Sequence, residues 1–213
     1  EGATAALAHA WHDAGITGQG VSVAIFDSFK DYSLAMSTGD LPPQVGAYPT
    51  TASVDTSSSS HGTAVAEIIH DMAPGASLIF ATPTTPVQRA NYTLALAQAG
   101  VRVISSSTGT AADTTGDGTG PVADAIAAAS QYGLTYVQAG GNQAERHWDG
   151  MFADTDGDRW HEYAPGWEVN LFNDGNPIPA GVLLPVYLRW DDWPVSSQDY
   201  DLYVVGWDGA SWI

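Results

Sequence analysis

The chain contains no cysteine and few basic residues, and each shortage excludes a class of protein. Without cysteine it can form no disulfide, no cysteine nucleophile and no cysteine-based zinc site. Its 213 residues include 24 acidic and 6 basic side chains, which gives a formal net charge of −18. A chain this acidic is repelled by nucleic acids and anionic membranes, so we expect neither as a partner. This balance is typical of a protein secreted into extracellular surroundings, and secreted bacterial enzymes often lack cysteine.

Long apolar runs are also missing. No run approaches the ~20 residues that a membrane helix requires. The chain opens on Glu1 rather than Met and shows no signal peptide, so we expect N-terminal sequence to have been removed or to lie outside it. Hydrophobic residues make up 44% of the chain and charged residues only 14%, which favours a folded core over a disordered acidic chain.

Short apolar runs alternate with helix-like segments over the first two thirds of the chain. We expect strands at 21–26, 77–81, 101–106 and 134–139, and helices at 4–14, 62–72, 87–99 and 122–132. The segment 28–60 is expected to be mostly loop. This alternation predicts an α/β fold with a doubly wound parallel sheet, whose ligands bind at the carboxyl ends of the strands.

The composition of the chain changes after Asn142. The remainder holds seven of the eight tryptophans and shows no helical period. Two of its segments, 183–190 and 200–207, have the pattern of strands. We therefore expect an α/β core over 1–142, and over 143–213 the start of a β-rich domain, an incomplete β-sandwich-like segment that Ile213 cuts off.

An aspartate at a strand end and a histidine at a helix start carry the clearest chemistry. The run 21–26 ends in Asp27, and His61 opens a helix in which Gly62 allows close approach and Thr63 can act as the N-cap. In a catalytic pair, Asp27 would accept a hydrogen bond from His61, fix its tautomer and stabilise the imidazolium. We expect the two side chains at about 2.6–3.2 Å. The alternatives are an Asp27 that caps the next turn and a His61 on a polar surface.

Four segments, in this order, resemble those of the subtilisin-like serine proteases (subtilases, peptidase family S8) over residues 15–142. They are Val23-Ala24-Ile25-Phe26-Asp27-Ser28, His61-Gly62-Thr63-Ala64-Val65-Ala66, Val103-Ile104-Ser105-Ser106-Ser107-Thr108-Gly109 and Val137-Gln138-Ala139-Gly140-Gly141-Asn142. The resemblance implies the subtilisin-like fold. It also implies a serine endopeptidase that cleaves peptides or proteins with an Asp27–His61–Ser triad and requires no cofactor.

The third and fourth segments would complete the site. The resemblance assigns to the substrate cleft Ser105, Ser106, Ser107, Thr108, Gly109, Gly140 and Gly141. An extended peptide would pair there with an open backbone edge. The Asn142 amide would face the oxyanion of the tetrahedral intermediate. The alternatives are a serine-rich strand end and a turn of the Gly-Gly-Asn type.

The chain departs from the family pattern at three places. Phe29 replaces a glycine, and Ala64 replaces a second histidine. The Gly-Thr-Ser nucleophile motif is absent, and Gly118-Thr119-Gly120 is the nearest string. Some bacterial subtilases carry a β-rich insertion between the Asn and Ser segments, and residues 143–213 are similar to its start. We therefore expect the nucleophile beyond Ile213, and this chain alone to be inactive.

Acidic residues alternate along one loop of the second part. Asp154, Asp156 and Asp158 stand at positions 1, 3 and 5, with Glu162 at position 9. Carboxylates spaced in this way converge on a loop and suit Ca²⁺, so a structural calcium site is one hypothesis. Arg159 departs from the EF-hand pattern, which has glycine there, and the alternative is a polar acidic loop.

A second class of function competes with the enzyme. Tryptophan-rich segments often serve recognition, so the chain could be a non-catalytic, degenerate subtilase module that binds a protein or a glycan. A Gly-Thr-Ser motif encoded downstream of Ile213 would favour the enzyme, and a stop codon the binding module. The sequence does not specify which substrate side chain is preferred before the scissile bond, nor the oligomeric state.

Overall fold

The computed structural model describes residues 2–50, 54–56, 59–109, 116–142, 147–192 and 195–207. The chain divides into two compact units. The first comprises residues 1–140 together with 188–213, and the second residues 141–187. The predicted boundary between residues 142 and 143 stays a prediction.

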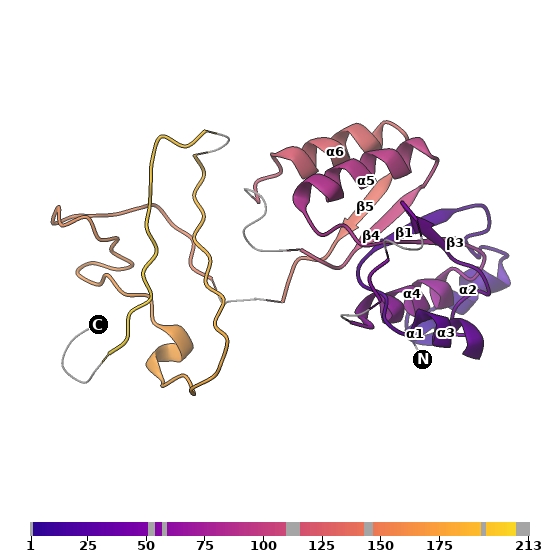
Figure 1. Ribbon diagram of the computed structural model, residues 1–213, viewed down its shortest axis with the longest axis horizontal. Coiled ribbons are helices and arrows are strands. Elements are labelled where there is room, and N and C mark those ends of the chain that lie inside the picture. The colour runs from indigo at the N-terminus through magenta and orange to yellow at the C-terminus, as the bar shows by residue number, and fades with distance from the viewer. Residues whose placement is uncertain are drawn as a thin grey trace. The chain divides into compact units, whose positions relative to one another are not determined.

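Within the described residues, a five-stranded parallel sheet forms the centre of the first unit (Figure 1). The strand order is β2-β3-β1-β4-β5. The bounds are β1 Ser22–Phe26, β2 Gly46–Tyr48, β3 Ser77–Ala81, β4 Val103–Ser106 and β5 Thr135–Gln138. Because β1 lies in the middle, with β3 and β2 on one side of it and β4 and β5 on the other, the sheet is doubly wound, and the predicted fold class is confirmed.

Helices cover both faces of this sheet (Figure 1). They are α1 Gly2–Ala5, α2 Ala8–Asp13, α3 Tyr32–Thr38, α4 His61–Met72, α5 Pro86–Gln98 and α6 Pro121–Ser130. Successive β1 side chains point to opposite faces. Val23 and Ile25 lie in one buried cluster with Ala66 of α4. Ala24 and Phe26 lie in another with Leu96 of α5, so β1 is apolar on both sides, as a central parallel strand requires.

The N-terminal part of the first unit differs from the prediction in three elements. The helix expected over 4–14 is broken into α1 and α2 at Leu7, whose φ is 57°. The segment 28–60, predicted as mostly loop, contains α3 and β2. α3 has seven residues and β2 only three, so neither is long enough to show a clear period in the sequence.

The second unit has little regular structure in its described part. It contains the 3₁₀-helix η2 Phe172–Gly175 and an isolated bridge between Ala164 and Trp167. Of the two segments predicted as strands, 183–190 crosses from the second unit into the first and 200–207 belongs to the first. Neither forms a strand in its described residues, and the β-sandwich-like segment is not confirmed. Apolar side chains there remain exposed, Leu183 by 89%, because no further strand is present in the described residues to bury them. No helix in the described residues is long and apolar enough to cross a bilayer.

Candidate active site

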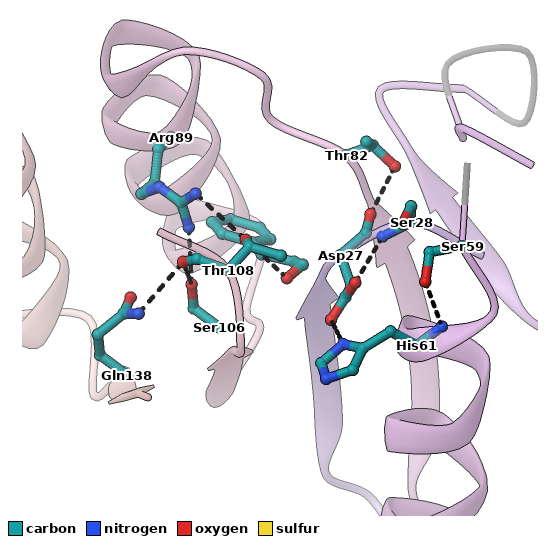
Figure 2. Close-up of polar contacts among 10 residues, drawn as sticks. Asp27, Ser28, Ser59, His61, Thr82, Arg89, Ser106, Thr108 and Gln138 are labelled. Carbon is teal, nitrogen blue, oxygen red and sulfur yellow. Dashed lines mark hydrogen bonds and ion pairs between the residues drawn. The ribbon is translucent and has the colours of Figure 1, made fainter. Parts of the chain in front are cut away.

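Asp27 is held at the carboxyl end of the central strand β1. Its backbone N–H donates to the Ala81 carbonyl at 3.1 Å, and its carbonyl accepts from Thr82 Oγ1 at 2.8 Å. The Ser28 N–H donates to the carboxylate oxygen Oδ1 at 2.8 Å (Figure 2). These contacts fix the carboxylate and leave its second oxygen, Oδ2, for another partner.

That partner is His61, the first residue of α4. His61 Nδ1 lies 2.8 Å from Asp27 Oδ2, so the predicted contact is present (Figure 2). The carboxylate side chain is 2% exposed and the imidazole 57%. An ionised carboxylate can only accept, so Nδ1 carries the proton of a neutral imidazole. Nε2, which has no hydrogen-bond partner within the described part of the chain, then presents its lone pair and can act as a base.

Gly62 allows α4 to begin directly against the end of β1. A Cβ atom on Gly62 would lie 2.5 Å from both Asp27 Cβ and the Ser28 carbonyl oxygen. The Gly62 N–H donates to that carbonyl at 3.0 Å. Any other side chain would therefore push the helix, and the imidazole with it, away from the carboxylate.

Thr63 does not cap the helix, in contrast to the prediction. It is buried inside α4, and its Oγ1 donates to the Lys30 carbonyl at 2.7 Å. The His61 N–H instead donates to Ser59 Oγ at 3.1 Å. The helix starts at His61, one residue earlier than its sequence pattern indicated. The hydroxyl of Ser59 therefore accepts the hydrogen bond at the helix start, and Thr63 holds the loop after Asp27 in place.

Phe29, which replaces a glycine of the family pattern, serves the core. Its side chain is fully buried and stacks on Phe80 of β3, with ring centroids 4.0 Å apart and an interplanar angle of 6°. Its backbone N–H donates to the Asp55 carbonyl at 2.7 Å. The departure therefore adds packing to the core cluster that also contains Ala66 of α4.

The segment expected to bind substrate continues from β4, the neighbour of β1. Phe26 and Ser106 are paired in register, so Asp27 and Ser107 leave the sheet at the same level. Ser105 and Ser106 are paired on one side with β1 and on the other with β5. The backbone of these two serines is not an open edge, and any open edge begins at Ser107.

A hydrogen-bonded group formed around Arg89 of α5 holds the end of β4 in place. Arg89 Nη1 donates to Ser106 Oγ at 2.7 Å, and Nη2 to Thr108 Oγ1 at 3.2 Å (Figure 2). Thr108 Oγ1 donates to the Phe26 carbonyl at 3.3 Å, and Gln138 Nε2 to the Thr108 carbonyl at 3.2 Å. The group thus connects the ends of β1, β4 and β5.

Neither Arg89 nor Gln138 is among the site residues predicted from the sequence. The available signal was charge: Arg89 is one of only 6 basic residues, and it lies near the N-terminal end of a helix. The helix dipole disfavours a cation at that end. Ser106, expected to face a substrate, instead has its hydroxyl buried against Arg89, with 1% of the residue exposed.

The chain leaves β5 through Gly140, Gly141 and Asn142. Gly141 has a φ of 90°, in the left-handed region that favours glycine, so turn geometry explains this residue. A Cβ on Gly140 would meet nothing within 4 Å. Asn142 is an exposed bend residue at the start of the second unit. Its role at an oxyanion stays a prediction.

Three of the four predicted calcium ligands come together. Carboxylate oxygens of Asp154, Asp156 and Asp158 lie within 4.8 Å of one another. Glu162 is not part of this group, and its Oε1 accepts from the Thr155 N–H at 3.2 Å and from the Thr155 hydroxyl. The backbone N–H groups of Gly157 and Arg159 donate to Asp154 at 2.7 and 3.1 Å, which curls the loop around that carboxylate.

The acidic loop shifts the ionisation of two glutamates in opposite directions. The hydrogen bond from the Thr155 hydroxyl lowers the pKa of Glu162, because it stabilises the ionised form. Loss of hydration to neighbouring atoms, together with the carboxylates of Asp158 and Asp156, raises the pKa of the exposed Glu168. The loop is therefore a region of concentrated negative charge.

Comparisons with known proteins identify the family. A model of the subtilase family matches residues 18–166, a range that includes Asp27, His61 and Asn142. No curated protein sequence matches the chain. The crystal structure of MycP1 with its N-terminal propeptide removed is similar, with 23% identity and a TM-score of 0.48. The match covers 74% of this chain and 54% of MycP1, so the chain spans about half the length of that protein. Because the family model matches most of its residues, the chain belongs to the subtilase family of serine proteases.

Proposed function

We propose that this chain carries the aspartate and histidine of a serine endopeptidase. The observation that supports the proposal is the 2.8 Å contact between a buried Asp27 carboxylate and a half-exposed His61 imidazole at the carboxyl edge of the sheet. Asp27 orients His61, whose Nε2 takes the proton of the attacking serine and later gives it to the leaving amine. The imidazolium formed in between is stabilised by the adjacent carboxylate.

The nucleophile belongs to sequence beyond Ile213. No serine in the chain follows the Gly-Thr-Ser pattern of the family, and Ser107 follows a strand rather than opening a helix. The serine oxygen would form a bond with the scissile carbonyl carbon, and the carbonyl oxygen would become the oxyanion that Asn142 stabilises. No cofactor takes part in these steps.

The substrate is an extended peptide that pairs with the backbone of residues 107–109. This segment continues a paired strand and leaves the sheet beside Asp27, so a bound peptide would present its carbonyl near His61. The family and the acidic composition both favour a secreted enzyme.

The decisive experiment uses the full-length protein, casein as substrate and a fluorophosphonate that labels reactive serines. We expect hydrolysis and labelling by the wild type, loss of both in His61→Ala, and retention of both in His9→Ala. His9 is a suitable control because it is an exposed histidine of α2 whose Nε2 contacts the Thr4 hydroxyl. A wild type that neither cleaves nor becomes labelled, yet binds a protein or glycan array, would instead support the non-catalytic module.

Asn142→Ala should lower kcat about 10²–10³-fold, because the oxyanion forms only in the transition state. KM should change little, since the side chain does not contact the ground-state substrate in this mechanism. Steady-state kinetics on the full-length protein measures the split. Asn91→Ala, at an exposed asparagine on α5, is the matched control. An unchanged kcat in Asn142→Ala would remove the residue from the oxyanion site.

Calcium should stabilise the folded chain if it binds at Asp154, Asp156 and Asp158. At free Ca²⁺ of about 100 times Kd, selective binding to the folded state contributes about 2.7 kcal/mol, or roughly 5–10 °C in Tm for a domain of this size. A thermal melt of EDTA-treated protein with and without Ca²⁺ tests this. Asp156→Asn should abolish the shift and Asp71→Asn, on the exposed surface of α4, should keep it. A shift that survives Asp156→Asn would contradict the site.

A further inference from the structure

Arg89 presents a positive charge at the substrate edge of an otherwise acidic protein. Both of its recorded partners, Ser106 Oγ and Thr108 Oγ1, are neutral hydroxyls. Within the described residues it makes no ion pair, although the chain holds 24 acidic side chains and could supply a partner easily. Its charge is therefore positioned but not neutralised.

The placement of this charge has a cost that a purely structural residue would avoid. Arg89 lies in the first turns of α5, where the helix dipole opposes a cation. It is half-buried, so part of its hydration is lost without compensation by a carboxylate. This favours a role for the charge itself.

We propose that Arg89 is a specificity-determining residue that selects peptide substrates bearing a carboxylate side chain. The inference rests on the proposed protease function and on the pairing of substrate with residues 107–109. Thr108 belongs to that segment and lies 3.2 Å from Arg89 Nη2, so a peptide running along it passes within side-chain reach of the guanidinium. Arginine has five N–H donors in a planar fork, and those not used by Ser106 and Thr108 can bind a carboxylate.

The overall negative charge of the chain opposes a preference for acidic peptides. A net charge of −18 repels acidic peptides at long range, so a preference for them requires a local cation. Without Arg89, the preference should disappear or reverse toward neutral side chains. A residue that only holds Ser106 and Thr108 in place would affect acidic and neutral peptides equally.

The test uses the full-length protein and pairs of fluorogenic peptides that differ only by Glu or Gln, exchanged at one position at a time on the amino-terminal side of the scissile bond. We expect the wild type to prefer Glu at one position by about tenfold or more in kcat/KM, as for a charge-assisted hydrogen bond. Arg89→Gln should lose this preference, so its kcat/KM should fall about tenfold further on the Glu peptide than on the Gln peptide, whatever loss the two peptides share. Arg89→Lys should recover part of the preference.

Arg102→Gln is the matched control, because Arg102 is an exposed arginine that donates to the Tyr132 carbonyl near the opposite end of β4. It should leave the Glu preference unchanged. Equal losses on both peptides in Arg89→Gln, or a wild type with no Glu preference at any position, would overturn the inference. In either case the wild type still cleaves and is labelled by the fluorophosphonate, whereas failure of the proposed function abolishes both. Fluorophosphonate labelling of Arg89→Gln shows that the variant still folds with a reactive serine, so its two peptides can be compared.

Discussion

Asp27→Asn is expected to lower kcat of the full-length protease by about 10⁴, with little change in KM or in the fold. The loss comes from the tautomer of His61, as for the equivalent change in other serine protease triads. The Ser28 N–H donates to the Oδ1 position at 2.8 Å, so the amide oxygen of the substituted side chain occupies that position. The NH₂ group of the amide then faces His61 Nδ1 in place of the carboxylate oxygen Oδ2.

This orientation leaves the histidine with its proton on the wrong nitrogen. Nδ1 must accept from the amide, so Nε2 carries the hydrogen and cannot take one from the serine. The change is isosteric and removes a buried charge, so the fold should persist. Steady-state kinetics with circular dichroism checks both points. Asp40→Asn, at a carboxylate that accepts from Thr38 in an exposed turn, should retain full activity. A kcat of Asp27→Asn within tenfold of wild type would show that Asp27 does not orient the base.

The pairing of Asp27 with His61 could be predicted from sequence because both lie at ends of strongly patterned elements. A central parallel strand is apolar on both faces, so the first polar residue after 21–26 marks its end. Gly62 was the second signal, and the structure gives its reason: a Cβ there would lie 2.5 Å from Asp27 Cβ. Local sequence rules and tertiary contact coincide at these residues.

The role of Arg89 could not be predicted in the same way, because it depends on contacts between elements. Its partners Ser106 and Thr108 come from β4 and the residues after it, and no spacing rule relates them to a helix position. Thr63 shows the same limit, since its contact with the Lys30 carbonyl replaces the capping bond that local rules favour. After residue 142, the pattern of 183–190 and 200–207 predicted strands, but strands also need partners, which a local pattern does not supply.

Residues 1–213 alone are expected not to hydrolyse peptides, the largest effect that we predict. A serine protease needs an alkoxide source beside its base, and no serine of the chain matches the nucleophile pattern. Removal of the serine from a subtilisin triad lowers kcat about 10⁶-fold. The oxyanion hole and substrate binding then still accelerate the reaction ~10³–10⁴-fold over the rate in water. Even this remaining acceleration requires an intact substrate cleft.

The exposed edge of the sheet is a second reason to expect no activity from residues 1–213 alone. Among the described strands β5 lies at the edge of the sheet, and its Val137 is 53% exposed, so a strand added beyond it would extend the sheet. Casein digestion by purified residues 1–213, with and without a fluorophosphonate, and by the full-length protein side by side measures the difference. Activity of the full-length protein alone is the expected result. Phosphonate-sensitive turnover by residues 1–213 would mean that a serine within the chain is the nucleophile. Ser107 would be the first to substitute, because it leaves the sheet at the level of Asp27.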